Sequence, residues 1–299
     1  MSPGNGHPYS WAAICNGYDK ENMASCPFPV IPQYLAKQEE ATMRLEGVLV
    51  THVWTQERKI SEHIAAASLI DNIVENPGEM IGKVDAVILA RDDGENHLQM
   101  AKPFLDAGVP MLIDKPLTDR QEDLREFVKY YEQGKIIMSC SSARFQRSVL
   151  DLKQKNDIGG ILTANGVSPK YWRTYGIHLI EGIYAVMGGG IKSVQNVGKK
   201  GEEIVHLSYA DGKHAVLQTF AKVTAGNMFF YGEKGCREVG DPDSFFSFKN
   251  MIGHFVDYLR TGKPPFDWHE TIETVKVVVA GEKSLQEGGR IVHLDEILI

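Results

Sequence analysis

The stretch VDAVILARDDGENHLQMAKPFLDAGVPMLIDKPLTD, from Val84 to Asp119, decides the fold. It opens with the continuous apolar run Val84–Ala90, which is typical of a parallel strand covered on both faces. The segment Asn96–Ala107 has helical spacing and ends before Gly108, a residue that suits a helix C-terminus. Val109–Ile113 then predicts a second strand. A strand, a crossover helix and another strand in succession indicate parallel pairing.

The same alternation continues on both sides of this stretch. Upstream, Gly47–Trp54 predicts a buried strand and Ile60–Ile73 a helix. Downstream, Thr118–Gln133 predicts a helix and Lys135–Cys140 another strand. The first half of the chain therefore predicts an α/β fold with a Rossmann-type, doubly wound parallel sheet.

The second half has a different pattern. Asp211-Gly212 favours a tight turn between two strands, and a second hairpin surrounds Gly232–Gly235. We therefore predict a C-terminal α+β domain with a mainly antiparallel sheet, and domains at residues 1–142 and 143–299. The expected elements are strands at 161–167, 203–210, 213–221, 227–231 and 236–239, and helices at 178–187, 247–259 and 271–285.

Composition excludes several classes of protein. The 299 residues carry a formal net charge of −7, which argues against a nucleic-acid partner. No apolar run of about 18 residues is present, so we expect no membrane span, and the first residues lack an export signal. The cysteines are widely spaced, so we expect no metal site, no disulfide framework and a reducing, cytoplasmic location. They are Cys15, Cys26, Cys140 and Cys236.

Gly4-Asn5-Gly6 precedes a helical stretch and is a candidate phosphate-binding turn. A Gly-x-Gly turn lets backbone N–H groups approach a pyrophosphate at a helix N-terminus. The third glycine of the usual pattern is replaced by Tyr9, and a flexible end is the alternative.

Two further candidates lie deeper in the chain. Lys115 follows the strand Val109–Ile113, and the carboxyl ends of parallel strands are where open α/β sheets bind ligands. His178 shares a narrow helical stripe with small residues, so it either faces a ligand or is a hydrogen-bonded interior residue. Aromatic and cationic side chains that suit a hydroxylated or carboxylated ligand, or else a domain interface, are Arg144, Trp172, Arg173 and Tyr175.

Taken together, these features resemble the glucose–fructose oxidoreductase / inositol dehydrogenase (Gfo/Idh/MocA) family. Asp114-Lys115-Pro116 is similar to the Glu-Lys-Pro of that family, and His97 matches its loop histidine. HFVDYLRTGKPP, from His254 to Pro265, resembles its late helix and turn. YGIHLIEGIYAVMG resembles the family's Gly-x-His-x-x-Asp helix, in which His178 takes the place of the catalytic histidine.

The resemblance implies a Rossmann domain that binds NAD or NADP and a second domain that holds a small-molecule substrate. Lys115 would orient the reacting oxygen, and His178 would be the general acid and base. The implied homo-oligomer is a dimer or tetramer formed through the C-terminal sheet. The cofactor-binding residues implied by the resemblance are Gly4, Asn5, Gly6, Thr55, Arg91, Asp92, His97 and Lys115.

Three features depart from the family pattern. Thr174 stands where the family has an acid, four residues before His178. Thr55 replaces the acid that binds the adenosine ribose and is followed by the cations Arg58 and Lys59, which favours NADP; the alternative is that these cations are only solvated helix charges. Only three residues precede Gly4, so the first strand of the sheet is missing, and the proline-containing stretch Tyr18–Arg44 is expected to be a loop. We expect that the sequence is truncated, that another segment such as Arg290–Ile299 takes the place of the strand, or that the sheet closes up.

These observations favour an oxidoreductase that exchanges hydride with a secondary alcohol or carbonyl of a sugar, cyclitol or similar polyhydroxylated molecule. The alternatives are a non-catalytic sensor or scaffold, and a non-redox enzyme that retains bound cofactor. Thr174 and the missing strand motivate the sensor or scaffold.

Overall fold

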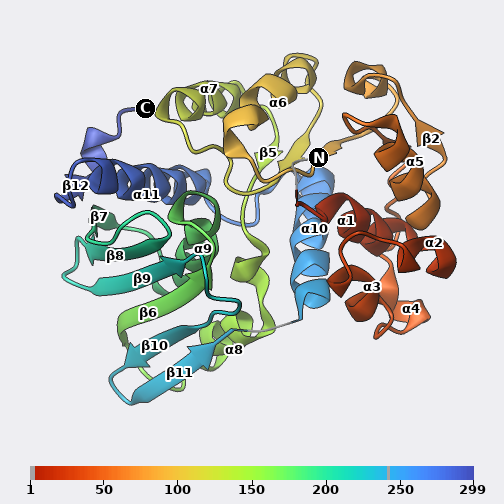
Figure 1. Cartoon of the computed structure of the whole chain (residues 1–299). Helices are drawn as coiled ribbons and strands as arrows, with labels where there is room; N and C mark the ends of the chain where they lie inside the picture. The colour runs from red at the N-terminus through yellow and green to blue at the C-terminus, as the bar shows by residue number, and fades with distance from the viewer. Residues whose placement is uncertain (1–3, 241–242) are drawn as a thin grey trace.

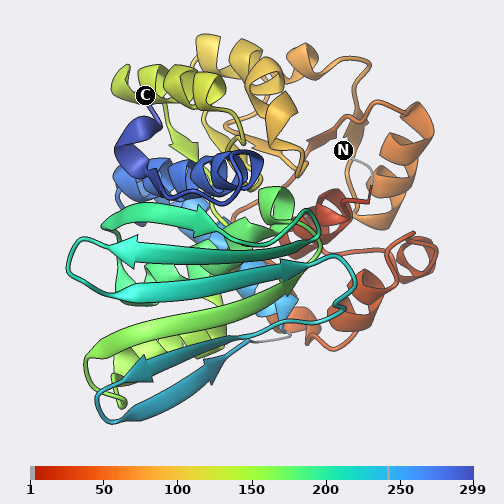
Figure 2. The same cartoon turned by 60° about the vertical axis from the view of Figure 1, so that its left-hand side comes forward.

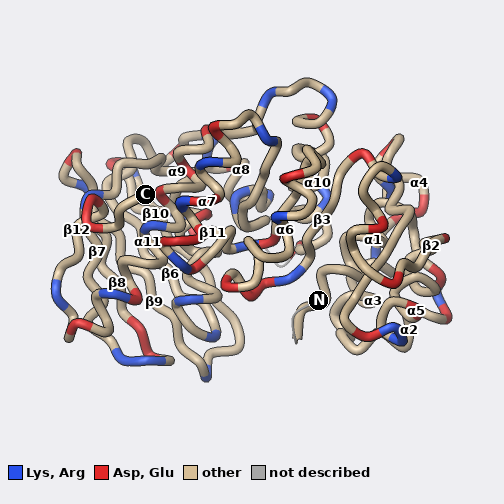
Figure 3. The backbone as a smooth tube through the Cα atoms, turned by 90° about the horizontal axis from the view of Figure 1, so that it is seen from above, with Lys and Arg blue, Asp and Glu red and all other residues tan. Residues whose placement is uncertain are grey.

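The computed structural model describes residues 4–240 and 243–299. The described part contains two small parallel sheets in the N-terminal half and a seven-stranded sheet in the C-terminal half (Figure 1). None of the described helices is both long and apolar enough to cross a membrane. Charged residues of both signs are interspersed over both halves (Figure 3).

The first parallel sheet pairs β1 (His52–Val53) with β2 (Asn72–Ile73). The second has the order β3-β4-β5 and comprises Val87–Leu89, Met111–Ile113 and Ile137–Met138. The helices beside these strands are α1 (His7–Asn16), α5 (Arg58–Ala67), α6 (His97–Asp106) and α7 (Gln121–Glu132), with short 3₁₀ turns at Pro77–Met80 and Gly94–Asn96.

Two expected strands are shorter than their sequences predict. In both 47–54 and 84–90, most of the residues are partly or fully exposed rather than buried. The reason is that β1 and β3 each have a partner on one side only, so among residues 4–240 and 243–299 no central strand joins the two sheets. The sheet is thus divided and has not closed up. The expected helix Ile60–Ile73 ends at Ala67 because Leu69 has a positive φ of 54° and the chain then enters β2.

The stretch Tyr18–Arg44 is not the loop that its prolines suggested. It forms three short helices: α2 (Lys20–Ala24), α3 (Val30–Leu35) and α4 (Glu40–Met43). Pro29 precedes α3 and Pro32 lies in its first turn, where proline leaves no intrahelical hydrogen bond unmade. Buried side chains of this stretch join the same core as α1. The prolines therefore mark a helix start.

The C-terminal sheet has the order β11-β10-β6-β9-β8-β7-β12, and its neighbours are antiparallel except β6 and β9. Helices lie along one face of this sheet, whereas the opposite face is open in Figure 2. The strands are β6 (Ile161–Pro169), β7 (Ile191–Asn196), β8 (Glu202–Tyr209), β9 (His214–Phe220), β10 (Met228–Gly232), β11 (Gly235–Val239) and β12 (Val292–His293). The helices are α8 (Arg147–Lys155), a π-helical turn (Trp172–Gly176), α9 (Ile177–Met187), α10 (Ser244–Thr261) and α11 (Trp268–Gln286), with 3₁₀ turns at Ser142–Phe145 and Leu294–Glu296.

The hydrophobic cores do not follow the order of the sequence. Helix α10 packs its buried face, including Met251 and Phe255, into the core that also contains Trp11 of α1. Figure 1 shows α10 running beside α1. The division at residue 142 stays a prediction. The late segment Arg290–Ile299 supplies β12, which pairs with β7, so this segment does not complete the N-terminal sheet.

Candidate functional site

Lys115 lies just beyond the carboxyl end of β4, and only 3% of it is exposed. Its Nζ atom lies 3.7 Å from Oδ2 of Asp92 and 4.9 Å from the centre of the Tyr175 ring. Lys115 thus carries a buried positive charge at the edge where parallel sheets bind ligands. Tyr175 comes from the π-helical turn before α9, so the two halves of the chain meet here.

His178 lies in the first turn of α9, with its ring 4.9 Å from the Tyr175 ring in an edge-to-face arrangement. A 2.6 Å hydrogen bond joins its Nδ1 atom to Oγ of Ser141. Burial lowers the pKa of His178 well below its usual value, and the positive charges of Lys115, His7 and Lys170 lower it further. His178 is therefore held as a neutral imidazole near pH 7, which can accept a proton.

Lys170 completes a cluster that we define as Lys115, Lys170 and His178 around the ring of Tyr175. The Lys170 Nζ atom donates a 2.6 Å hydrogen bond to the Tyr175 hydroxyl and lies 4.1 Å from the ring centre. Lys170 has a positive φ of 66°, a conformation that costs energy for a residue with a side chain. The cluster suits a ligand that carries oxygen atoms with negative or partial negative charge.

Asp114 ties the N-terminal turn to this cluster. Its Oδ2 atom accepts hydrogen bonds from Asn5 Nδ2 at 3.0 Å and from His7 Nδ1 at 2.5 Å. Burial alone would raise the pKa of Asp114, but the charges of His7 and Lys115 and these hydrogen bonds leave it lowered. Asp114 is therefore a buried carboxylate that fixes the turn beside Lys115.

The first turn of α1 has few N–H groups left for a pyrophosphate. The N–H of His7 donates to Oδ1 of Asn5 at 2.7 Å, and Pro8 has no N–H. The N–H of Tyr9 donates to the Gly6 carbonyl at 3.1 Å. A dinucleotide phosphate needs such donors at a helix N-terminus.

The space beside the second glycine is also filled. A methyl group added at Gly6 would lie 2.7 Å from Cδ1 of Ile31 and 2.8 Å from Cγ of Phe28. At Gly4, with φ of 79°, nothing lies within 4 Å of such a methyl group. In this arrangement the turn does not fit the pyrophosphate of a dinucleotide. Lys115 and His178, which the resemblance assigns to catalysis, both lie beside the Tyr175 ring.

The other residues expected to bind cofactor have protein partners. The Thr55 hydroxyl bonds to Ser61 and to the Glu57 carbonyl. His97 is fully buried, with its ring nitrogens 3.0 Å and 2.9 Å from the carbonyl oxygens of Leu117 and Arg91. The Arg91 side chain is paired with Asp93, and the Arg58 side chain with Glu62 and Glu75. His97 thus holds the β3–α6 loop against the chain beyond β4.

Of the four residues expected to bind substrate, the structure brings only Tyr175 to the cluster. Trp172 is completely buried and donates from Nε1 to the Val278 carbonyl at 3.0 Å. Arg173 is half exposed and pairs with Asp119 and Glu95. Arg144 is buried, and its Nε and Nη1 atoms donate to Glu181 at 2.6 Å and Glu270 at 2.5 Å.

Sequence reasoning missed Ser141, His7 and Lys170. The sequence could have indicated Ser141, because this residue directly follows the expected strand Lys135–Cys140. Lys115 has a similar place, two residues after the strand Val109–Ile113. The Ser141 hydroxyl supplies His178 with the hydrogen bond that Thr174 does not supply. Lys170 reaches the cluster through a left-handed backbone conformation, for which its own sequence gives no indication.

The lowered pKa of His178 predicts how stability depends on pH. Its pKa in the unfolded chain is about 6.5, so the unfolded state takes up a proton at a pH where the folded state does not. Stability therefore falls as the pH drops below about 6.5. When the pH is lowered from 7.5 to 5, we expect the free energy of unfolding to fall by up to about 2 kcal/mol more in the wild type than in His178→Gln. Urea unfolding at both pH values measures this difference, and parallel losses in the two proteins would contradict it.

The comparisons with known proteins agree with this architecture. Residues 31–141 match a family model described as an oxidoreductase family with an NAD-binding Rossmann fold (GFO_IDH_MocA). The match begins after the Gly4–Gly6 turn and contains Lys115. No curated protein matches the chain.

Solved structures resemble most of the chain. A putative myo-inositol dehydrogenase from Sinorhizobium meliloti is 16% identical, with 84% of this chain and 93% of that one covered and a TM-score of 0.73. Scyllo-inositol dehydrogenase from Lactobacillus casei, with bound NAD(H) and scyllo-inositol, is 14% identical (86% and 97% covered, TM-score 0.74). A putative NADPH-dependent oxidoreductase from Desulfitobacterium hafniense is 15% identical (90% and 96% covered, TM-score 0.74).

The divided parallel sheet and the seven-stranded sheet form a two-part α/β fold, with Lys115 just beyond β4. Residues 31–141 are similar to the Gfo/Idh/MocA oxidoreductase family, and the chain shares its fold with inositol dehydrogenases.

Proposed function

We propose that this protein is an NAD(P)-dependent oxidoreductase that exchanges hydride with a secondary alcohol or carbonyl of a polyhydroxylated small molecule. The observation that carries the proposal is the placement of Lys115 and His178 within 4.9 Å of the same Tyr175 ring. A buried ammonium and a neutral imidazole on one ring can act together on one substrate oxygen.

In the oxidation direction, the neutral His178 accepts the proton of the substrate hydroxyl. Lys115 stabilises the negative charge that develops on the oxygen as the proton leaves. In the reduction direction, His178 returns the proton to the carbonyl oxygen. A bound nicotinamide would accept or supply the hydride itself. Ser141 orients the His178 ring through the hydrogen bond to Nδ1.

The chemistry of the cluster supports a sugar, a cyclitol or a similar molecule as the substrate. Lys115 and Lys170 present ammonium groups to hydroxyl oxygens, and Tyr175 presents an aromatic surface. The similar Lactobacillus casei structure holds scyllo-inositol. Binding of a dinucleotide would require the side chains of Phe28 and Ile31 to move away from Gly6.

A second candidate is a non-catalytic family member that acts as a sensor or scaffold. The turn before α1 favours this candidate, because the His7 N–H already donates to the Asn5 side chain and Pro8 has no N–H for a phosphate. This candidate requires neither cofactor binding nor turnover.

Titration with all four nicotinamide dinucleotides separates the two candidates. The oxidoreductase predicts saturable one-to-one binding of NAD(H) or NADP(H), with a Kd between about 1 μM and 1 mM. It also predicts a rise in Tm on addition of that dinucleotide, because a ligand of the folded state stabilises it. The choice between NAD and NADP is read from the same titration. If the well-folded protein binds none of the four, the oxidoreductase is excluded and the scaffold is favoured.

The homo-oligomer remains a proposal. Exposed apolar side chains on strands of the C-terminal sheet support association through its open face (Figure 2). They are Ile204 and Tyr231.

A further inference from the structure

Two ammonium groups lie against the ring of Tyr175. The Nζ atoms of Lys115 and Lys170 are 4.9 Å and 4.1 Å from the centre of this ring. They are therefore no further apart than the sum of these two distances, which a single molecule of the size of a hexose can span. Lys115 is buried, whereas Lys170 is exposed. One ammonium group thus lies deep in the site and the other lies at its surface.

The two ammonium groups differ in their partners. The Lys115 Nζ atom lies 3.7 Å from Oδ2 of Asp92, and its charge also acts on the carboxylate of Asp114. In the described part of the chain, the partners of the Lys170 Nζ atom are the hydroxyl and the ring of Tyr175, and no carboxylate pairs with it. The positive charge of Lys170 is therefore available to a ligand.

The segment that carries Tyr175 adds no negative charge. The π-helical turn Trp172–Gly176 contains no acid, and its Arg173 is paired with carboxylates of other segments. The charge of Lys170 reaches as far as His178, whose pKa it helps to lower. A cation that acts on His178 and has no acid beside it can stabilise an anionic group of a ligand bound there.

Lys170 is held in a strained backbone conformation. Its φ of 66° lies in the left-handed region, which glycine adopts readily and a lysine rarely adopts. Lys170 directly follows β6 and precedes the turn that carries Tyr175. Strained residues of this kind cluster at ligand sites, where the surrounding contacts hold them in place. A lysine that was merely solvated would need neither the strained backbone nor the hydrogen bond to Tyr175.

The hydrogen-bonding groups at Lys170 favour an anion over a neutral hydroxyl. A lysine ammonium group has three donors and no acceptor, whereas a sugar hydroxyl both donates and accepts. The Tyr175 hydroxyl accepts from Lys170 at 2.6 Å and has no other partner among the described residues, so its own proton can be donated to a ligand. An ionised carboxylate only accepts, and a phosphate offers several acceptor oxygens. Such groups form charge-assisted hydrogen bonds with these donors.

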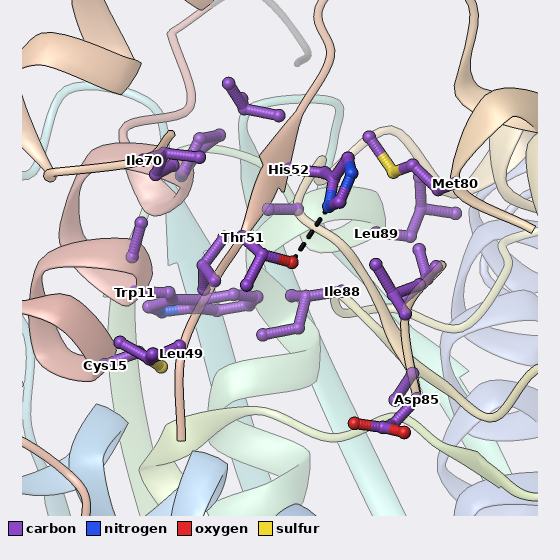
Figure 4. Close-up of a pocket in the computed structure, with 18 of the residues that line it drawn as sticks. Trp11, Cys15, Leu49, Thr51, His52, Ile70, Met80, Asp85, Ile88 and Leu89 are labelled. Carbon is purple, nitrogen blue, oxygen red and sulfur yellow. Dashed lines mark hydrogen bonds between the residues drawn. The ribbon is translucent and has the colours of Figure 1, made fainter. Parts of the chain in front are cut away.

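A separate cavity of about 540 Å³ lies between the segments that contain β1 and β3. Figure 4 shows Trp11, Ile88 and Leu89 among the side chains around it. Its lining is mainly apolar and includes none of the four residues of the cluster. An anionic group would lose its hydration there without gaining a cluster of donors. The cluster around Tyr175 is thus the better place for such a group.

We propose that the substrate of the proposed oxidoreductase carries an anionic group, a carboxylate or a phosphate ester, that binds to Lys170 and the Tyr175 hydroxyl. The reacting hydroxyl lies several bonds away on the same molecule, at Lys115 and His178. This substrate class rests on the proposed function, because only turnover makes the ligand a substrate. Binding of the anionic group to Lys170 requires neither cofactor nor hydride transfer.

The experiment is calorimetry on the full chain without dinucleotide, with two sets of probes that share a carbon skeleton within each set. They are D-glucose, D-glucuronate and D-glucose-6-phosphate, and the corresponding three compounds of D-galactose. We expect at least one anionic probe to bind at least tenfold more tightly than its neutral parent at low salt. The difference should shrink at an ionic strength of about 0.5 M, because salt screens the charges. The tighter binder of the two anionic probes in a set distinguishes a carboxylate from a phosphate.

A matched pair of variants tests the place of binding. Lys170→Met should weaken binding of the anionic probe at least tenfold and binding of its neutral parent less than twofold. The control is Lys102→Met, because the Lys102 Nζ atom also donates to a tyrosine hydroxyl, that of Tyr130 at 3.0 Å, and lies 5.7 Å from the centre of its ring. This control should change neither affinity. Equal losses in the two variants would overturn the proposal.

A further variant, Lys170→Gly, separates binding from folding. Glycine adopts a positive φ without strain, so we expect a Tm close to that of wild type together with the loss of tight anion binding. Lys170→Arg keeps the charge and should bind the anionic probe within about fivefold of wild type. A folded Lys170→Gly protein that binds the anionic probe as tightly as wild type would contradict the proposed place of the anion.

The outcome is distinguishable from failure of the proposed function. If the anionic probe binds through Lys170 but no nicotinamide dinucleotide binds, the anion site stands and the oxidoreductase is excluded. If a dinucleotide binds but every neutral parent binds as tightly as its anionic probes, the anionic substrate class is wrong and the oxidoreductase stands. Absence of binding of all four anionic probes at 10 mM would also overturn the proposal.

Discussion

Replacing Arg144 by methionine is expected to lower the free energy of unfolding by about 3–5 kcal/mol. The guanidinium is buried between Glu181 and Glu270 and lies 4.3 Å from the Phe266 ring. Burial raises the pKa of Glu181 even though Arg144 lowers it, so this carboxylate depends on its partner. Without Arg144, Glu181 either remains as an unpaired buried charge or takes up a proton. Urea unfolding at pH 7.5 measures the loss.

The matched control is Arg58→Met, which removes a half-exposed arginine paired with the exposed carboxylates of Glu62 and Glu75. Exposed ion pairs contribute about 0–1 kcal/mol, so this variant should remain close to wild type. The double variant Arg144→Met/Glu181→Met should recover much of the lost stability, because it leaves no unpaired charge at Glu181. A loss below 1 kcal/mol in Arg144→Met would show that the buried network contributes little.

Replacing Lys115 by methionine is expected to lower kcat/KM about 100- to 1,000-fold for whichever polyhydroxylated substrate is turned over. The reason is the loss of the one ammonium group that lies both beyond β4 and against the Tyr175 ring. Methionine keeps an unbranched apolar side chain, and Asp114 retains Asn5 and His7 as partners. Initial rates in both directions measure the effect.

The same variant has a readout that does not depend on the substrate. The positive charge of Lys115 lowers the pKa of His178, so its removal should raise that pKa. An NMR titration of the His178 ring in both proteins measures the change. The control is Lys102→Met, at a lysine that is exposed and paired with Asp106, which should change neither the rate nor the pKa of His178. Unchanged turnover in a folded Lys115→Met protein would remove Lys115 from the proposed mechanism.

Local patterns in the sequence were enough for most of the elements. The alternation from Val84 to Ile113 predicts β3, α6 and β4, and all three are present. Asp211-Gly212 correctly marks the hairpin of β8 and β9, although only Gly212 has a positive φ. These features depend on side-chain spacing and on turn geometry, which act over a few residues.

The candidate site could be predicted only in part. Lys115 and His178 were expected from their places after a strand and on a helix, and the structure brings them to one ring. Trp172 has the aromatic character of a ligand-binding residue, but it packs in the core against α11 and donates to Val278. Residue type alone does not distinguish these two uses of an aromatic side chain.

The sequence by itself determined the succession of β3, α6 and β4, the change from a parallel to a mainly antiparallel part, and the positions of Lys115 and His178. These follow from spacing and from turn residues, which are properties of short segments. Only the tertiary structure decided that Arg144 pairs with Glu181, that Ser141 bonds to His178, and that the segments of β1 and β3 line one cavity. These depend on contacts between residues far apart in the chain, which local spacing does not encode.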